Sequence, residues 1–110
     1  SDHVYKNHNK TLLLYHLVFP AKYRQKVFTA EVENTLKEVC IGISERYEIR
    51  FLEIGSDSDH VLFFIQSIPT VTIREVVTTI KSITARMIFK KHPEVKELLW
   101  VETFGQVDIT

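Results

Sequence analysis

The stretch IRFLEIGSDSDHVLFFIQSIP, residues 49–69, decides the fold. Two runs rich in β-branched and aromatic residues, which favour strands, flank a Gly-Ser-Asp-Ser-Asp segment. Glycine, serine and aspartate favour turns. The pattern predicts a β-hairpin with strands over residues 48–54 and 60–68, a turn over residues 55–59, and an end at Pro69. The segments on either side then determine how a sheet is completed.

A helix is predicted on each side of this hairpin. Before it, Thr29 can cap a helix whose first turn carries Glu31 and Glu33, carboxylates that favour the positive end of the helix dipole. After it, Thr72 and Glu75 have the spacing of a capping box, and this helix is expected to end near residues 92–93. Apolar residues recur at helical spacing in both segments. They are Val32, Leu36, Val39, Cys40, Ile43 and Tyr47 in the first, and Ile73, Val76, Val77, Ile80, Ile83 and Met87 in the second.

Apolar segments near both ends of the chain complete a four-stranded pattern. Residues 10–19 predict a strand buried on both faces, in which we expect His16 to be a buried, hydrogen-bonded imidazole. Residues 98–109 have strand character interrupted by Gly105. The order β-α-β-β-α-β is that of an α+β, ferredoxin-like fold, an antiparallel sheet with two helices on one face.

Length and composition indicate one globular domain. With 110 residues, 45% of them hydrophobic and 25% charged, the chain can build a single core. Residues 1–10 predict a loose N-terminal arm ahead of a domain over residues 11–110. The apolar stretches are too short to span a bilayer and the first residues are polar, so we expect no membrane partner. The single cysteine, Cys40, excludes an internal disulfide and favours a cytoplasmic location.

The net charge of zero conceals segments of opposite sign. Residues 20–28 have a net charge of +3 and residues 70–96 one of +4, whereas residues 29–59 have one of −5. Separated charge of this kind is typical of a polyanion-binding face, and solvated helix surfaces also produce it. The candidate DNA-binding residues are Lys22, Arg24, Lys26, Arg74, Lys81, Arg86 and Lys90.

Three patterns, in register over residues 11–110, together resemble one protein family. They are Tyr15-His16 leading to Lys22-Tyr23-Arg24, Leu52-Glu53-Ile54 followed by Asp59-His60-Val61, and Ile80-Lys81-Ser82 followed by Ala85-Arg86, His92-Pro93 and Leu99-Trp100. On the predicted fold they resemble the single-tyrosine HUH transposases of the insertion-sequence two-hundred type, including their REP-associated relatives. The resemblance implies a homodimer that recognises hairpins in single-stranded DNA, and that cuts and rejoins DNA during transposition of a mobile element.

The same resemblance implies a metal site that is incomplete here. In the family, two histidines one residue apart on a strand share one face and hold a divalent metal, which polarises the scissile phosphate. His60 matches the first histidine, but Leu62 occupies the second position and cannot ligate a metal. We therefore expect no cofactor in this chain, whereas active relatives use Mg²⁺ or Mn²⁺.

The resemblance further implies a tyrosine nucleophile, which has no counterpart in this sequence. The chain stops at Thr110, ahead of the helix that would carry it, and we find no activating partner for Tyr5, Tyr15, Tyr23 or Tyr47. A decayed or repurposed copy and a fragment of a longer protein both explain this, and truncation does not explain Leu62. We predict a DNA-binding protein with impaired cleavage and leave its status as an enzyme open.

Other interpretations compete with this one. An active transposase would need an unrecognised ligand in place of Leu62 and a tyrosine from missing sequence. A non-catalytic ferredoxin-like module would act by oligomerisation or by binding a ligand. For single residues, His60 can be a turn histidine bonded to Asp57 or Asp59 rather than a metal ligand, and Trp100 and Phe104 favour strand packing over base stacking.

Overall fold

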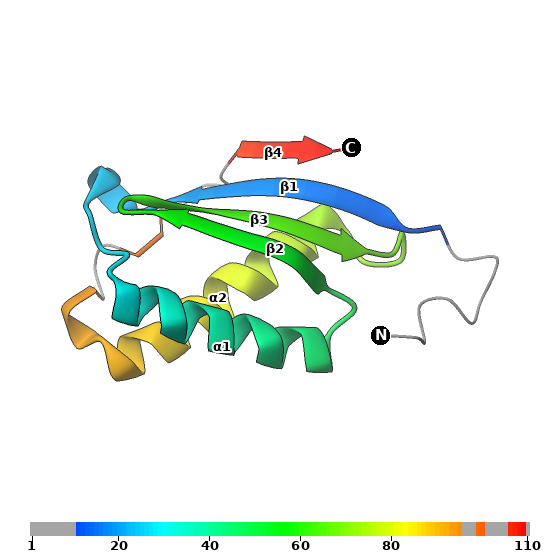
Figure 1. The fold of residues 1–110 in the computed structure, drawn as a ribbon. Coiled ribbons are helices and arrows are strands. Elements are labelled where there is room, and N and C mark those ends of the chain that lie inside the picture. Colours follow the sequence, from blue (N-terminus) through cyan, green and yellow to red (C-terminus); the bar gives the residue numbers. More distant parts are fainter. Residues whose placement is uncertain (1–10, 96–98, 101–105, 110) are drawn as a thin grey trace.

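The computed structural model describes residues 11–95, 99–100 and 106–109, so the predicted arm over residues 1–10 lies outside it. The elements within these residues are β1 (Leu13–Pro20), η2 (Lys22–Arg24), α1 (Ala30–Arg46), β2 (Arg50–Asp57), β3 (His60–Ser67), α2 (Ile73–Lys91), η3 (Pro93–Val95) and β4 (Gln106–Ile109). The sheet order is β2-β3-β1-β4 and all neighbours are antiparallel. Both long helices lie beneath one face of the sheet (Figure 1), which confirms the predicted α+β arrangement.

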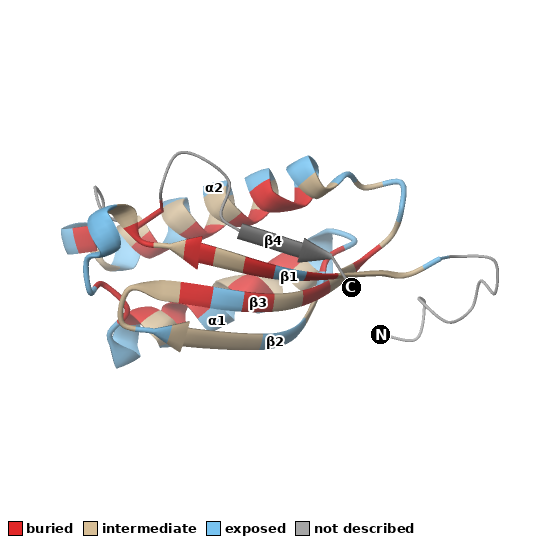
Figure 2. Ribbon diagram, turned by 90° about the horizontal axis from the view of Figure 1, so that it is seen from above, coloured by how far each residue is buried: buried red, intermediate tan, exposed pale blue. Residues whose placement is uncertain are grey.

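The strands alternate between a core face and an outer face. On β3, Val61, Phe63 and Ile65 are buried, whereas Leu62 between them is 47% exposed. β1 alternates in the same way, as the banding in Figure 2 shows. The prediction that residues 10–19 are buried on both faces is therefore wrong, and His16 is exposed rather than buried. One face of the sheet therefore builds the core, and the other faces away from the helices.

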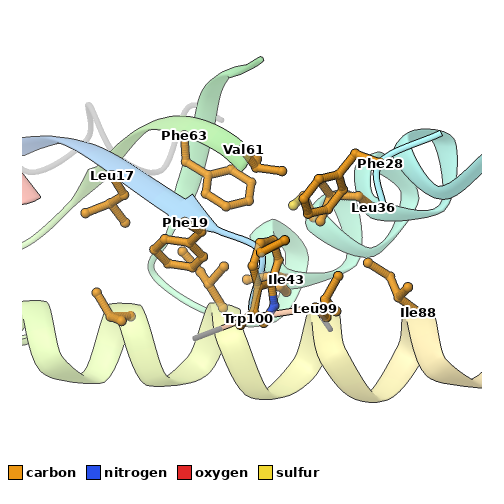
Figure 3. Packing of buried hydrophobic residues seen from close by; sticks show 14 of the residues in the cluster. Leu17, Phe19, Phe28, Leu36, Ile43, Val61, Phe63, Ile88, Leu99 and Trp100 are labelled. Carbon is orange, nitrogen blue, oxygen red and sulfur yellow. The ribbon is translucent and has the colours of Figure 1, made fainter. Parts of the chain in front are cut away.

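Aromatic rings meet in the core between the sheet and the helices (Figure 3). Phe19 packs edge-to-face on Phe63 and on Trp100, with ring centroids 5.2 and 5.4 Å apart. The buried indole of Trp100 donates a hydrogen bond of 2.9 Å to Thr84 Oγ1. Trp100 packs as predicted but lies outside any strand, because the described part of the last strand begins at Gln106. Phe104 falls outside the described residues.

Both predicted helix starts are confirmed at the level of single hydrogen bonds. Thr29 Oγ1 accepts from the backbone N–H of Val32 at 3.3 Å. Thr72 and Glu75 form the reciprocal capping box, with bonds of 2.8 and 3.1 Å. The second helix ends at Lys91 with His92 as its C-cap, close to the predicted end.

Three details of the predicted elements are wrong. Tyr47, expected on the apolar stripe of the first helix, is the C-cap that follows Arg46 and is exposed. β2 continues through Asp57, so that the hairpin turn is shorter than the predicted segment over residues 55–59. Met87 is exposed, and the buried positions around it are Thr84 and Ile88. No helix in the described part of the chain has the length and hydropathy needed to cross a membrane.

Candidate functional site

The site lies at the end of the sheet where β1 ends and β3 begins. Pro20 on β1 pairs with His60 on β3, and the basic loop over residues 20–28 starts directly from this pair. Two backbone hydrogen bonds fasten the loop to the hairpin turn: Ala21 N–H donates to Asp59 C=O at 2.9 Å, and Phe28 N–H donates to Ser58 C=O at 3.1 Å. The basic loop and His60 therefore form one local unit.

The Asp59 carboxylate joins the side chains of this unit. Arg24 Nε donates to Asp59 Oδ2 at 3.2 Å, and His60 Nδ1 lies 2.9 Å from Asp59 Oδ1. Both hydrogen bonds lower the pKa of Asp59 below its ordinary value of 3.8, and the bond with His60 has the larger effect. An ionised carboxylate is acceptor-only, so Nδ1 of His60 carries the hydrogen and a neutral His60 has its lone pair on Nε2. Of the two partners considered for His60 from sequence, the structure selects Asp59.

The backbone of the loop is held in a strained conformation. Tyr23 and Arg24 have φ angles of 57° and 53°, in the left-handed region that favours glycine. Such a conformation costs roughly 1–3 kcal/mol for each non-glycine residue and persists only where surrounding contacts impose it. The Arg24–Asp59 bond and the two backbone hydrogen bonds are contacts of that kind, and they leave the side chain of Tyr23 79% exposed. The sequence gives no glycine or asparagine here that could have signalled this conformation.

The outer sheet face beside His60 is apolar. Leu62 and Phe64 follow His60 on the same face of β3. The Phe64 ring stacks on the exposed imidazole of His16, with centroids 4.3 Å apart and planes 10° from parallel. Across residues 11–95, 99–100 and 106–109, no three His, Cys, Asp or Glu side chains come together as a metal-binding group. One imidazole, next to a carboxylate already bonded to Arg24, does not match the two-histidine site that the resemblance implies.

The structure divides the predicted DNA-binding residues into two groups. Lys22, Arg24 and Lys26 lie on the basic loop, where Lys26 is exposed and Lys22 is half-buried. The other four lie along α2. Arg74 is in its first turn, the Lys81 ammonium lies 5.7 Å from the centroid of the buried Phe19 ring, and Arg86 and Lys90 lie in its second half.

Arg86 and Lys90 line a groove of about 470 Å³ between α1 and α2. Arg46 from α1, a residue not predicted from sequence, and the exposed Met87 also line it. Lys91 lines it too, but its ammonium lies 3.6 Å from Glu38 Oε1 and is partly neutralised. Nothing in the helical periodicity of α1 distinguished Arg46 from a solvated surface residue.

Comparison with known proteins identifies the family. Residues 9–107 match the family model for IS200-like transposases. The chain belongs to the IS200-like transposase family. It is 32% identical over 88 residues to the ISDra2 transposase TnpA of Deinococcus radiodurans, which covers 80% of this chain. It is 22% identical over 89 residues to the transposase for insertion sequence element IS200 of Salmonella typhimurium, which covers 81% of this chain.

A crystal structure of a transposase from Deinococcus radiodurans gives the corresponding structural match. It superimposes with a TM-score of 0.77 at 25% identity, covering 91% of this chain and 78% of that one. The match spans 63% of the length of the ISDra2 transposase and 59% of that of the IS200 transposase. This chain therefore has the fold of the IS200-like family. It corresponds to about three fifths of the length of these two curated relatives.

The lowered pKa of Asp59 predicts a pH-dependent attachment of the basic loop. The ionised carboxylate is bonded in the folded state, so its stabilising effect is present above pH 3.8 and is lost as the pH falls through the lower folded-state pKa. We expect the variant Arg24→Ala to raise the pKa of Asp59 part of the way to 3.8, because the His60 bond remains. A carboxyl-carbon NMR titration measures this. Arg50→Ala, at an exposed position on β2, is the control. An equal pKa of Asp59 in wild type and in Arg24→Ala would contradict the account.

Proposed function

We propose that this chain binds single-stranded DNA as part of an IS200-like transposase, with hairpins as its preferred ligands, and that its metal-dependent strand cleavage is impaired. The observation that carries the proposal is the family match over residues 9–107. The relatives are named as transposases, so DNA is the partner class that this membership supports.

The basic loop supports DNA binding by its position and its charge. Residues 20–28 contain three cations and no acid, and the loop is fastened to the hairpin turn beside His60. The last turns of α2, which carry Arg86 and Lys90, lie at the same end of the molecule as η2 (Figure 1). Cations held on rigid elements at one end of a domain can follow the phosphates of a strand, because phosphate contacts require charge and position rather than sequence.

Leu62 supports the impairment of cleavage. Side chains two residues apart on a strand share a face, so a histidine at this position would present a second imidazole beside that of His60. Leu62 instead places an apolar side chain there. A divalent metal needs several donor atoms from the protein, and His60 supplies one nitrogen while the Asp59 carboxylate is bonded to Arg24. We therefore infer weak or no binding of Mg²⁺ or Mn²⁺ at this site.

The free edge of the sheet supports a homodimer as the working form. β2 is an edge strand of the described sheet, and the exposed side chains of Leu52 on β2 and Ile41 on α1 line a groove of about 780 Å³. An edge with adjacent apolar residues is a favourable surface for association between copies of one chain. This observation also favours the second candidate function, an oligomerisation module without DNA binding, and the DNA experiment below separates the two.

Binding to a single-stranded hairpin oligonucleotide is predicted to exceed binding to a scrambled strand and to fall steeply with salt. The logarithm of the binding constant should decrease linearly with the logarithm of the salt concentration, with a slope of about −0.7 for each phosphate neutralised on a single strand. The double variant Lys22→Gln and Lys26→Gln should weaken binding by about tenfold or more at low salt and flatten the slope. Fluorescence anisotropy measures both quantities.

The matched control for this experiment is Lys37→Gln, which removes one cation from the exposed side of α1 and should leave both quantities unchanged. Light scattering on the same samples gives the stoichiometry, with two chains expected in each complex. Failure of the wild-type chain to bind the hairpin at about 50 mM salt would contradict the proposed function and favour the oligomerisation module.

The substitution Leu62→His is predicted to create a metal site. It restores two imidazoles on one face of β3, so affinity for Mn²⁺ or Co²⁺ should rise at least tenfold over wild type in isothermal titration calorimetry. Gln66→His is the control, because this position shares the outer face but lies about 20 Å along the strand from His60. Strong Mn²⁺ binding by the wild-type chain, removed by His60→Ala, would contradict the inferred impairment.

A further inference from the structure

We propose that Tyr23 is a stacking platform for one unpaired nucleobase, and that Arg24 positions this platform instead of contacting phosphate. The inference rests on the proposed function, because the base belongs to the single strand that the domain binds. Tyr23 belongs to the Lys22-Tyr23-Arg24 motif of the resemblance, but the sequence analysis gave its side chain no role in binding. Three features of the loop carry it: the exposure of the ring, the backbone that holds it, and the charges beside it.

The exposure of Tyr23 separates it from most other aromatic side chains. Phe19, Phe28, Phe63 and Trp100 are buried in the core, whereas Tyr23 is 79% exposed. Its ring does not stack on any other ring among the described residues. A ring in this setting contributes little to the core, yet the chain holds it on a strained backbone, and such strain concentrates where side chains are displayed for function.

The loop displays this ring on a fixed base. Both Tyr23 and Arg24 adopt the left-handed conformation, and the Arg24 guanidinium is bonded to the Asp59 carboxylate through Nε and Nη2, at 3.2 and 3.5 Å. Backbone bonds from Ala21 and Phe28 to the hairpin turn close the loop on both sides. Arg24 is thus engaged within the protein, and its contribution to binding is to hold the preceding residue in place. A pre-positioned ring loses little conformational freedom when a base stacks on it.

The charges around the ring fit a single strand. Lys22 precedes Tyr23 and the exposed Lys26 follows it, so cations for phosphate flank an exposed aromatic face. Aromatic faces combined with backbone-tracking cations are the usual means of binding single-stranded nucleic acid without base-specific hydrogen bonds. In a duplex both faces of each base are already stacked, so the ligand that suits Tyr23 is a base that is unpaired or flipped out of a hairpin.

The test compares three substitutions at one position by fluorescence anisotropy with the hairpin oligonucleotide. Tyr23→Ala and Tyr23→Gly should each weaken binding about 5- to 150-fold, the range of a single base–aromatic stack. Tyr23→Gly suits the left-handed backbone, so its melting temperature should equal or exceed that of wild type, which separates loss of the ring from loss of folding. Tyr23→Phe keeps the ring and should bind within about twofold of wild type. Tyr47→Ala, an exposed tyrosine at the end of α1, is the control.

A photo-crosslink supplies a second readout that a structural role for Tyr23 would not produce. Irradiating the complex with 5-iodouracil placed in the unpaired part of the oligonucleotide should give an adduct that mass spectrometry locates at Tyr23. Wild-type affinity in Tyr23→Gly would overturn the inference and leave the proposed function standing. A loss in Tyr23→Phe as large as that in Tyr23→Gly would overturn stacking in favour of a role for the hydroxyl. Absence of hairpin binding by wild type would overturn both.

Discussion

The Asp59 carboxylate joins two segments that are 35 residues apart in the chain, and the geometry of the site depends on this link. Without it, the Arg24 guanidinium would lose the bond that helps to offset the left-handed backbone of the loop, and the Nδ1 hydrogen of His60 would lose its acceptor. The carboxylate can perform both tasks because it has two acceptor oxygens, Oδ2 facing Arg24 Nε and Oδ1 facing His60 Nδ1. These hydrogen bonds also lower its pKa below the ordinary value. A short turn between two long strands places it at the end of the sheet, which makes the link a consequence of the fold.

The alternation of the strands explains how the family fold can accommodate different residue types on the outer face of its sheet. Val61, Phe63 and Ile65 point into the core, and replacing any of them would disturb the packing against Phe19 and the helices. Leu62 lies on the opposite face, where the core imposes no constraint on the residue type. A histidine and a leucine at this position are therefore equally compatible with folding. The chain can therefore keep the fold of its relatives with Leu62 at this position.

Local signals predicted the fold well. The two helix caps depend on side chains three residues apart, and the hairpin depends on a polar segment between two apolar runs, so both could be recognised without knowing the rest of the structure. The errors arose where distant partners decide the outcome. Thr84 is buried beneath Trp100, whose indole donates to its hydroxyl, whereas Met87 is exposed. His16 is exposed because it lies on the outer face of β1, where its stacking partner is Phe64 from β3. The sequence was enough to predict that the basic loop and His60 belong to the candidate site. It did not predict the left-handed turn that exposes Tyr23.

The central claim is that the basic loop and the hairpin turn beside it form the DNA-binding site of this domain. An amide NMR titration of the chain with a single-stranded hairpin oligonucleotide tests this claim most directly, because it reports on every described segment at once. The account predicts that the largest chemical-shift changes occur in residues 20–28 and 58–60. Changes confined to the groove between α1 and β2, or no changes at all at low salt, would contradict it.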